Sequence, residues 1–310
     1  MKKLISLVTP CFNEADNVRE VYQQVKDVFA QMPEYRYEHI FIDNASTDKT
    51  VSILREIAKN DLNVKVIINS RNFGVARSPY HALLQSRGDA TIVVMADLQD
   101  PPPLIKDLIK KWESGYDIVN AIRIDANKNA SFKKYSSRYF YRLFSVFTDV
   151  KLEEGSADFR LIDKKIIDNI KNLGERELFL RGIFGWLGFK TTNVQYLPNK
   201  RFSGTTKYSM RKMVSFALTG ITSFSVVPLR MAALTGFLVA ALTSIYMAYA
   251  LASALLIGNV LDGWTSLILA VLFLGGVQLI AIGVLGEYIG KIFIEIKGRP
   301  RYVIKSIKGW

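Results

Sequence analysis

The chain has 310 residues, of which 49% are hydrophobic, and its 41 basic and 28 acidic residues give a formal net charge of +13. This length suffices for two domains of ordinary size with buried cores. A single cysteine, Cys11, excludes an internal disulfide, and the presence of just two histidines, His39 and His81, argues against a zinc site. Both counts fit a catalytic domain in the reducing cytosol.

The first hundred residues alternate between strand-like and helix-like segments. The apolar, β-branched runs are LISLVT (4–9), HIFID (39–43), VKVIIN (64–69) and ATIVVM (90–95), and the helix-like segments between them are 14–31, 47–59 and 78–86. This alternation predicts βαβ units around a parallel sheet. The apolar stretch at the N-terminus is short and acidic residues follow it at once, so it predicts a first strand and not a secretory signal.

Acidic side chains follow the predicted strands, where ligands bind to a parallel sheet. Glu14 follows the first strand, Asp43 and Asp48 follow the second, and Asp97 and Asp100 follow the fourth. Glu14, the Asp43/Asp48 pair and Asp97 together suggest a ligand with a base, a ribose and phosphates, although Asp48 is also explained as a helix cap. A buried carboxylate is costly unless it is paired, and hard oxygen ligands suit Mg²⁺ or Mn²⁺, so Asp97 is the expected metal contact.

The glycine-rich phosphate loops GxxxxGK[ST] and GxGxxG do not occur in the sequence, which disfavours P-loop and Rossmann chemistry. A diphosphate must then be neutralised by a metal ion and by distant basic residues. Arg201 and Lys207 in KRFSGTTKY (200–208) are suited to phosphate binding, or alternatively belong to a basic cluster that attracts anionic lipid. Asp158 in GSADFRLID (155–163) is a further candidate for a side chain that points into the same ligand-binding cleft. The alternative is an aspartate in a surface turn.

Two segments, one in the middle of the chain and one at the start of its C-terminal third, combine apolar residues at helical spacing with basic residues. Residues 132–147 and 209–228 are expected to be amphipathic helices at a bilayer surface, with ordinary core-facing helices as the alternative.

Two long uncharged stretches, 231–261 and 264–286, lie near the C-terminal end of the chain. Each exceeds the ~20 residues that a helix needs to cross a bilayer, so two transmembrane helices are expected; a very apolar buried hairpin is the alternative. The loop 259–263 has no lysine or arginine, whereas both outer flanks are basic. The positive-inside rule therefore predicts a multi-pass membrane protein with its large N-terminal domain and both termini in the cytoplasm. With such spans, the net charge favours anionic lipid and a phosphorylated substrate over nucleic acid.

Six motifs occur in a fixed order before the two apolar stretches: TPCFNEADN, FIDNASTD, NSRNFG, ADLQDPP, GSADFRLID and RFSGTTKY. In this order they resemble the family-2 glycosyltransferases that load sugars onto polyprenyl phosphates, and most closely the bacterial bactoprenol glucosyltransferases of O-antigen (lipopolysaccharide) modification. The resemblance covers essentially the whole chain. It implies a cytosolic α/β domain of GT-A type over 1–208, a juxtamembrane helix over 209–228, two transmembrane helices within 229–294 and a basic cytosolic tail over 295–310.

The resemblance also implies roles for individual residues. Asp97 would hold the metal ion, Asp158 would be a second catalytic residue near the reacting centre, and Arg201 and Lys207 would bind phosphates. The residues implied for the donor nucleotide are Pro10, Phe12, Glu14, Asp43, Gln99 and Arg123.

The sequence departs from the family pattern in two places. Asn44 and Ala45 stand where the family often has an aspartate and a glycine, and Met95 stands where a DxD motif would have its first aspartate. The metal site is therefore expected to rest on Asp97, diphosphate oxygens and water.

The implied reaction is the inverting transfer of glucose from UDP-glucose to undecaprenyl phosphate at the cytosolic face of the bacterial inner membrane, with Mg²⁺ or Mn²⁺. The alternatives are the same chemistry with another donor, such as GDP-mannose in a dolichyl-phosphate-mannose-like enzyme or an aminoarabinose-type donor, and a non-catalytic nucleotide-binding membrane scaffold. Glycines in the two apolar stretches allow close helix approach and a possible homo-oligomer, without naming its stoichiometry.

Overall fold

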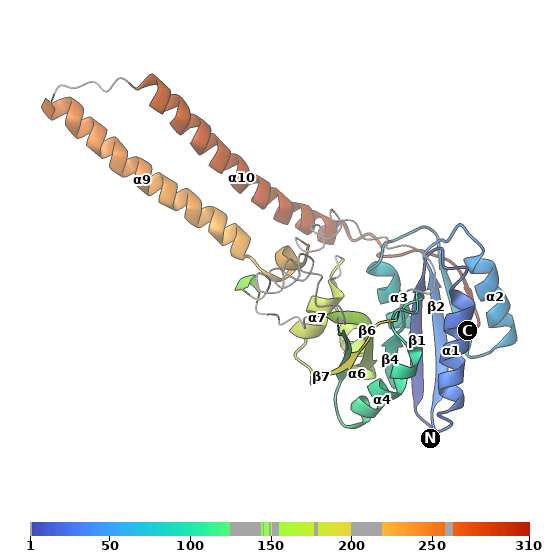
Figure 1. The fold of residues 1–310 in the computed structure, drawn as a ribbon. Coiled ribbons are helices and arrows are strands. Elements are labelled where there is room, and N and C mark those ends of the chain that lie inside the picture. The colour runs from blue at the N-terminus through green and yellow to red at the C-terminus, as the bar shows by residue number, and fades with distance from the viewer. Residues whose placement is uncertain are drawn as a thin grey trace.

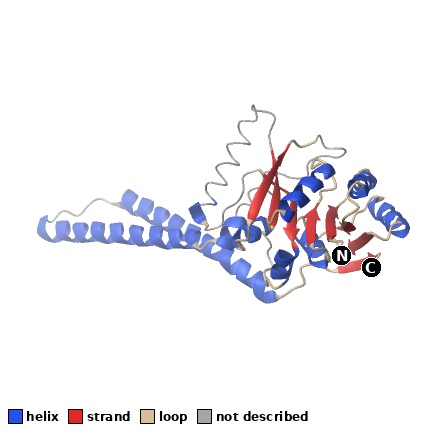
Figure 2. Ribbon diagram, turned by 90° about the horizontal axis from the view of Figure 1, so that it is seen from below, coloured by secondary structure: helices blue, strands red, loops and turns tan. Residues whose placement is uncertain are grey.

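The computed structural model describes residues 2–124, 144, 146–148, 150, 155–176, 179–199, 219–257 and 263–310. The strands are β1 (Leu4–Cys11), β2 (Arg36–Asp43), β3 (Val64–Asn69), β4 (Ala90–Val93), β5 (Ile118–Arg123), β6 (Ser156–Asp163), β7 (Thr191–Tyr196) and β8 (Ile304–Lys308). The helices are α1 (Val18–Ala30), α2 (Thr50–Asn60), α3 (Arg77–Gln85), the short 3-10 helix η1 (Pro102–Leu104), α4 (Ile105–Glu113), α6 (Lys164–Lys171), α7 (Leu180–Trp186), α9 (Val227–Ile257) and α10 (Trp264–Lys297). A sheet with helices on both faces forms one part, and α9 and α10 project from it as a long hairpin (Figures 1 and 2).

The eight strands form one sheet in the order β7-β5-β6-β4-β1-β2-β3-β8. Strands β1 to β4 are parallel, β5 and β7 run in the same direction, and β6 and β8 run antiparallel to their neighbours. The mostly parallel sheet expected from the sequence is thus confirmed. Because β6 is antiparallel, its first residues lie at the edge where the parallel strands end.

Alternation along the strands builds a separate apolar core on each face of the sheet. Ile5 and Leu7 of β1 belong to the core that α1, α2 and α4 cover, whereas Val8 belongs to the core that α3, α6 and α7 cover. Helix α1 buries Val18, Val21, Val25, Val28 and Phe29, a three- and four-residue spacing that places them on one helix face.

The expected strands and helices of the first hundred residues are present with small differences at their ends; β4, for example, ends at Val93, two residues before the expected position. The C-terminal segment contains a strand that was not expected. Residues 304–308 form β8 on the outer side of β3, so the basic segment 295–310 contributes to the sheet.

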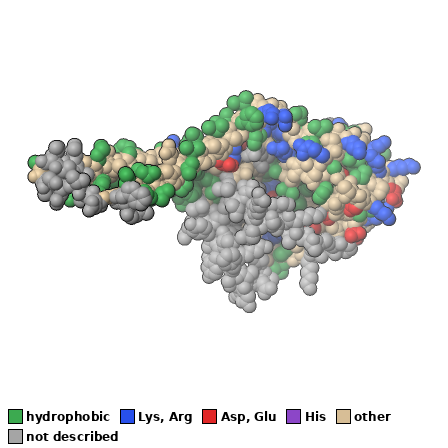
Figure 3. Space-filling model, turned by 90° about the horizontal axis from the view of Figure 1, so that it is seen from above, with side chains coloured by type: hydrophobic (Ala, Val, Ile, Leu, Met, Phe, Trp, Pro, Cys, Tyr) green, Lys and Arg blue, Asp and Glu red, His purple; other side chains and the backbone are tan. Residues whose placement is uncertain are grey.

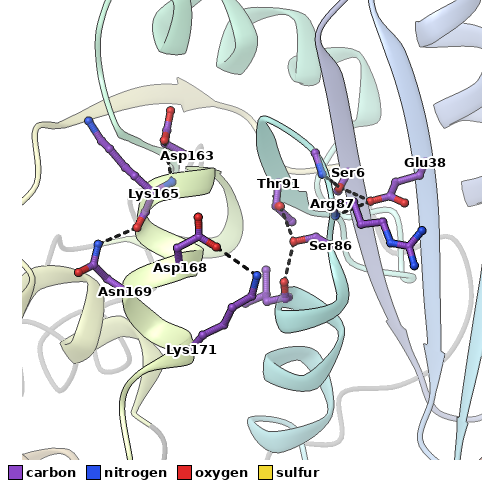
Figure 4. Close-up of polar contacts among 12 residues, drawn as sticks. Ser6, Glu38, Ser86, Arg87, Thr91, Asp163, Lys165, Asp168, Asn169 and Lys171 are labelled. Carbon is purple, nitrogen blue, oxygen red and sulfur yellow. Dashed lines mark hydrogen bonds and ion pairs between the residues drawn. The ribbon is translucent and has the colours of Figure 1, made fainter.

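A polar cluster lies towards the amino-terminal ends of the strands, away from the edge considered below (Figure 4). Glu38 is buried and accepts hydrogen bonds from the Ser6 hydroxyl, the Arg87 backbone N–H and the Lys65 ammonium. Burial alone would raise the pKa of Glu38, but these donors outweigh it and hold the pKa below its usual value.

Helices α9 and α10 are each long and apolar enough to cross a membrane, by length and composition, over Val227–Tyr249 and Ala270–Lys297. Hydrophobic side chains are visible along the hairpin, while lysine and arginine side chains gather on the rounded domain (Figure 3). Of the two expected amphipathic segments, residues 132–143 and 209–218 lie outside the described residues.

Both ends of the hairpin are attached to the sheet domain. Before α9, the ring of Phe224 contacts the ring of Phe179 at the start of α7, with ring centroids 6.0 Å apart. After α10, the Arg301 guanidinium donates to the Tyr80 hydroxyl (2.6 Å) and to the Leu173 carbonyl (2.7 Å), and Tyr302 stacks on His81. The hairpin therefore leaves the domain and returns to it.

Candidate active site

The residues expected at the site gather along one edge of the sheet. Strands β1, β2, β4 and β5 end there and β6 begins there, which brings together side chains far apart in the chain. At or just after these strand ends, or at the start of β6, lie Pro10, Phe12, Glu14, Asp43, Asp97, Gln99, Arg123 and Asp158. Arg201 and Lys207 lie outside the described residues, and their expected phosphate contacts remain predictions.

Three residues other than glycine have a positive φ among those described, and all three lie at this edge. They are Asn13 after β1 (φ 55°), Ala45 after β2 (φ 61°) and Leu98 after β4 (φ 55°). The left-handed conformation is unfavourable for side chains with a Cβ, most of all for a bulky residue such as leucine. Backbone strain of this kind clusters at ligand-binding sites.

The loops after β1 and β2 are joined by hydrogen bonds. The backbone N–H of Asn13 donates to the Ser46 hydroxyl (2.9 Å), and that of Thr47 donates to the Asn13 side chain (2.9 Å). Asp43 is fully buried and accepts from the Ser46 N–H (2.9 Å) and hydroxyl. Burial nevertheless raises the pKa of the Asp43 carboxyl, so further N–H or O–H donors from a ligand would stabilise its ionised form.

Asp48 and Asn44 have structural roles. Asp48 accepts from the backbone N–H of Thr50, the first residue of α2 (2.9 Å), so it fixes the start of the helix, although the N-cap position itself is Lys49. The buried Asn44 side chain donates to the Asn72 side chain (2.9 Å) and accepts from the Phe73 N–H (2.9 Å). Asn44 thus holds the loop after β3.

Asp97 follows β4, and its Oδ1 accepts from the Gln99 backbone N–H (3.3 Å). Within the described part of the chain, no group of three or more His, Cys, Asp or Glu side chains is placed to hold a metal ion. The donor set expected from the sequence at this point is small, with the Asp97 carboxylate and the neighbouring Gln99. Such a set fits a hard cation that keeps several waters and takes other ligands from a substrate's phosphates, as Mg²⁺ does.

Asp158, near the start of β6, pairs with Arg181 of α7, whose Nε donates to Oδ1 (3.0 Å). Desolvation would raise the pKa of this carboxyl, but the charges of Arg181, Arg160 and Arg123 outweigh it and hold the pKa below its usual range. Asp158 is therefore ionised at neutral pH and is a weak base, which suits it to orienting a substrate more than to removing a proton.

Arg123 ends β5, and its guanidinium meets a fully buried carboxylate. Its Nε (3.0 Å) and Nη2 (2.7 Å) donate to Oδ1 of Asp100, and the Tyr196 hydroxyl at the end of β7 donates to the same oxygen. Arg123 was expected at the site from the sequence, whereas Asp100 had no predicted role and neither Tyr196 nor Arg181 was expected there. Asp100 could have been predicted from the sequence, since an acidic residue after a buried strand needs a partner. Nothing in the local sequence indicates a site role for Tyr196 or Arg181.

Comparison with known proteins agrees with this fold. Residues 6–171 match glycosyl transferase family 2, and residues 227–292 match the GtrB C-terminal hairpin. The chain belongs to glycosyl transferase family 2. This family 2 glycosyltransferase is 41% identical over 304 residues to the prophage bactoprenol glucosyl transferase homolog of Escherichia coli (strain K12), covering 98% of this chain and 99% of the relative.

Two further relatives of this family 2 glycosyltransferase extend over nearly the same length. The bactoprenol glucosyl transferase of Shigella phage SfV is 42% identical over 304 residues, covering 98% of this chain and 99% of its own. The uncharacterized glycosyltransferase YkcC of Bacillus subtilis (strain 168) is 40% identical over 304 residues, covering 98% of this chain and 94% of its own. The similarity therefore includes both the GT-A domain and the hairpin.

Proposed function

We propose that this glycosyltransferase transfers glucose from UDP-glucose to undecaprenyl phosphate, with inversion, at the cytosolic face of the bacterial inner membrane. The observation that carries the proposal is the similarity of about 40% identity, over nearly the whole chain, to proteins named bactoprenol glucosyl transferases. Because that similarity includes the hairpin, it supports a shared acceptor as well as a shared sugar-transfer domain.

The contacts around Asp158 support delivery of a lipid acceptor from the hairpin side. Asp158 pairs with Arg181, and the next residue, Gly182, packs so tightly that an added Cβ would lie 2.6 Å from the Phe224 ring. Phe224 stands three residues before α9. One short helix therefore separates the reacting edge from the point where the chain enters the hairpin, which suits a substrate whose phosphate stays at the membrane surface.

The sheet supports the proposed topology. The chain enters α9 from the domain and returns after α10 to place β8 on β3, so both ends of the hairpin lie on one side. If α9 and α10 span the membrane, the catalytic domain and the segment 304–308 share a compartment. The basic flanks of the hairpin support the cytoplasm as that compartment.

In the proposed mechanism an oxygen of the lipid phosphate attacks the anomeric carbon opposite the leaving UDP. The acceptor phosphate is already ionised at neutral pH, so the weak base Asp158 serves to orient the acceptor with Arg181. Arg123 binds the diphosphate and stabilises the charge that grows on it. Asp97, with Gln99 beside it, would hold a divalent cation, Mg²⁺ or Mn²⁺, which would supply Lewis-acid assistance to the leaving group.

The test is UDP release from UDP-glucose by the purified full chain with Mg²⁺ or Mn²⁺, with and without undecaprenyl phosphate. We expect lipid-dependent release that is lost in Asp97→Asn and retained in Asp107→Asn, an exposed aspartate of α4 that serves as the matched control. Equal release by Asp97→Asn would contradict the role of Asp97. Release from GDP-mannose or another sugar nucleotide in place of UDP-glucose would assign a different donor, and no release from any donor would favour the scaffold alternative.

A further inference from the structure

Asp100 is a buried carboxylate that the mechanism above does not use. Its side chain has no exposed surface, yet three hydrogen bonds converge on Oδ1, two from Arg123 and one from Tyr196, while Oδ2 has no hydrogen-bond partner in the described structure. Burying a carboxylate is costly even when it is paired. A role at the site would explain why the chain has a fully buried carboxylate three residues after the predicted metal contact.

Strand pairing explains how these side chains meet. Arg123 and Tyr196 are opposite each other in the parallel pair β5 and β7, so the two side chains leave the same edge of the sheet. Asp100 reaches them from the loop after β4. That loop is tied to the end of β7 a second time, because the Asn199 N–H donates to the Gln99 carbonyl (2.9 Å).

The arrangement engages one edge of the guanidinium and leaves the other available. Nε and Nη2 of Arg123 point to Asp100, and Nε also donates to the Tyr196 hydroxyl (3.0 Å). Nη1 has no hydrogen-bond partner in the described part of the chain, and the Arg123 side chain is 38% exposed. An arginine fixed in this way presents two N–H donors in a set direction, which suits phosphate oxygens.

We propose that Asp100 and Tyr196 are positioning residues that hold Arg123 in place for the diphosphate of the sugar-nucleotide donor. The proposal rests on the proposed function, since it concerns the donor of that reaction. Fixing the guanidinium before the donor arrives removes the entropy cost of ordering a long side chain on binding. Asp97 and Asp100, three residues apart, then have distinct tasks: Asp97 would hold the metal ion, and Asp100 supports the arginine.

The proposal predicts that Tyr196 acts on the donor through Arg123. The measurement is the dissociation constant of UDP, by calorimetry with Mg²⁺, for the full chain and for Tyr196→Phe, Arg123→Ala and the double variant. Tyr196→Phe removes the hydrogen bonds of the Tyr196 hydroxyl with the Asp100 carboxylate and the Arg123 guanidinium. This loss is expected to weaken UDP binding about 3- to 10-fold. In the Arg123→Ala background the same change should have no further effect.

Tyr80→Phe is the matched control, because the Tyr80 hydroxyl is also bound to an arginine, Arg301, and its hydrogen bonds reach none of the residues expected at the site. Its affinity for UDP should equal that of the unmodified chain. Asp100→Asn, which keeps the side-chain shape, should weaken UDP binding at least as much as Tyr196→Phe; if it does not fold, the cycle with Arg123 decides alone.

Equal and independent losses from Tyr196→Phe in both backgrounds would overturn the proposal, as would unchanged affinity in Tyr196→Phe. These outcomes leave the proposed function intact when the unmodified chain still binds UDP and turns over UDP-glucose. An unmodified chain that binds no UDP would instead overturn the proposed donor and the positioning role together.

Discussion

Replacing Arg301 by methionine is expected to loosen the return of the chain from α10 to the catalytic domain. The guanidinium donates to the Tyr80 hydroxyl (2.6 Å) and to the Leu173 carbonyl (2.7 Å), and it lies 4.9 Å from the centroid of the Tyr80 ring. Methionine keeps an unbranched apolar stem but removes every donor. The carbonyl of Leu173 and the hydroxyl of Tyr80 then each lose a charged partner.

The magnitude follows from these contacts. Each hydrogen bond contributes ~1 kcal/mol net and the contact with the ring contributes ~0.5–1 kcal/mol, giving about 3 kcal/mol for the variant. For a domain of ~200 residues, 1 kcal/mol corresponds to ~2–4 °C in Tm, so the melting temperature should fall by roughly 6–12 °C.

The assay is thermal unfolding of the detergent-solubilised full chain. Arg299→Met is the matched control, since it removes the same charge from the same loop at an exposed position and its backbone carbonyl, which accepts from Arg176, is unchanged. We expect a shift below ~1 °C in this control. Equal melting temperatures for Arg301→Met and Arg299→Met would refute the reasoning, because they would mean that the loop after α10 does not stabilise the domain.

Three further predictions concern stability and are each read from unfolding curves. Gly182→Ala should destabilise the chain by ~1–3 kcal/mol, because a Cβ there would lie 2.5 Å from one phenylalanine ring and 2.6 Å from another; a gain in stability, as is usual for helical Gly→Ala, would contradict the packing. Lys65→Met should cost ~3 kcal/mol in urea unfolding at pH 7, because it leaves Glu38 buried without its cation; an unchanged midpoint would show that the pair is not formed. Burial lowers the pKa of His39 to about 3 and of His81 to about 4, so both rings remain neutral in the fold while the unfolded chain binds protons below pH ~6.5. The contribution of the two neutral rings to the free energy of unfolding is complete above that pH and is lost as pH falls towards 4, by up to ~1.4 kcal/mol per pH unit for each ring. A melting temperature that stays constant from pH 7 to 5 would contradict this expectation.

Local pattern accounts for the parts of the fold that were predicted from sequence. The first four strands are apolar runs bounded by polar residues, and α1 shows its buried face as valines three and four residues apart. The edge position of Asp43 and Asp97 followed from the same logic, since side chains after parallel strands meet at one edge.

Pairing between distant segments accounts for what was missed. Strand β8 has a short mixed sequence, IKSIK, that local propensity does not mark, and it is ordered by pairing with β3, more than 230 residues earlier. Tyr196 reaches Asp100 because β7 lies beside β5, and Arg181 reaches Asp158 because α7 packs near the start of β6. Each contact depends on the completed topology, which one sequence alone does not reveal.

The place of β8 in the chain also sets an order of events during synthesis. The ribosome makes β3 early, whereas residues 304–308 emerge after both helices of the hairpin, so the outer edge of β3 stays open until the end. An open edge presents unpaired N–H and C=O groups and is prone to wrong association. A hairpin that failed to return would leave that edge exposed, so capping by β8 makes a finished catalytic domain conditional on correct placement of the hairpin that precedes it.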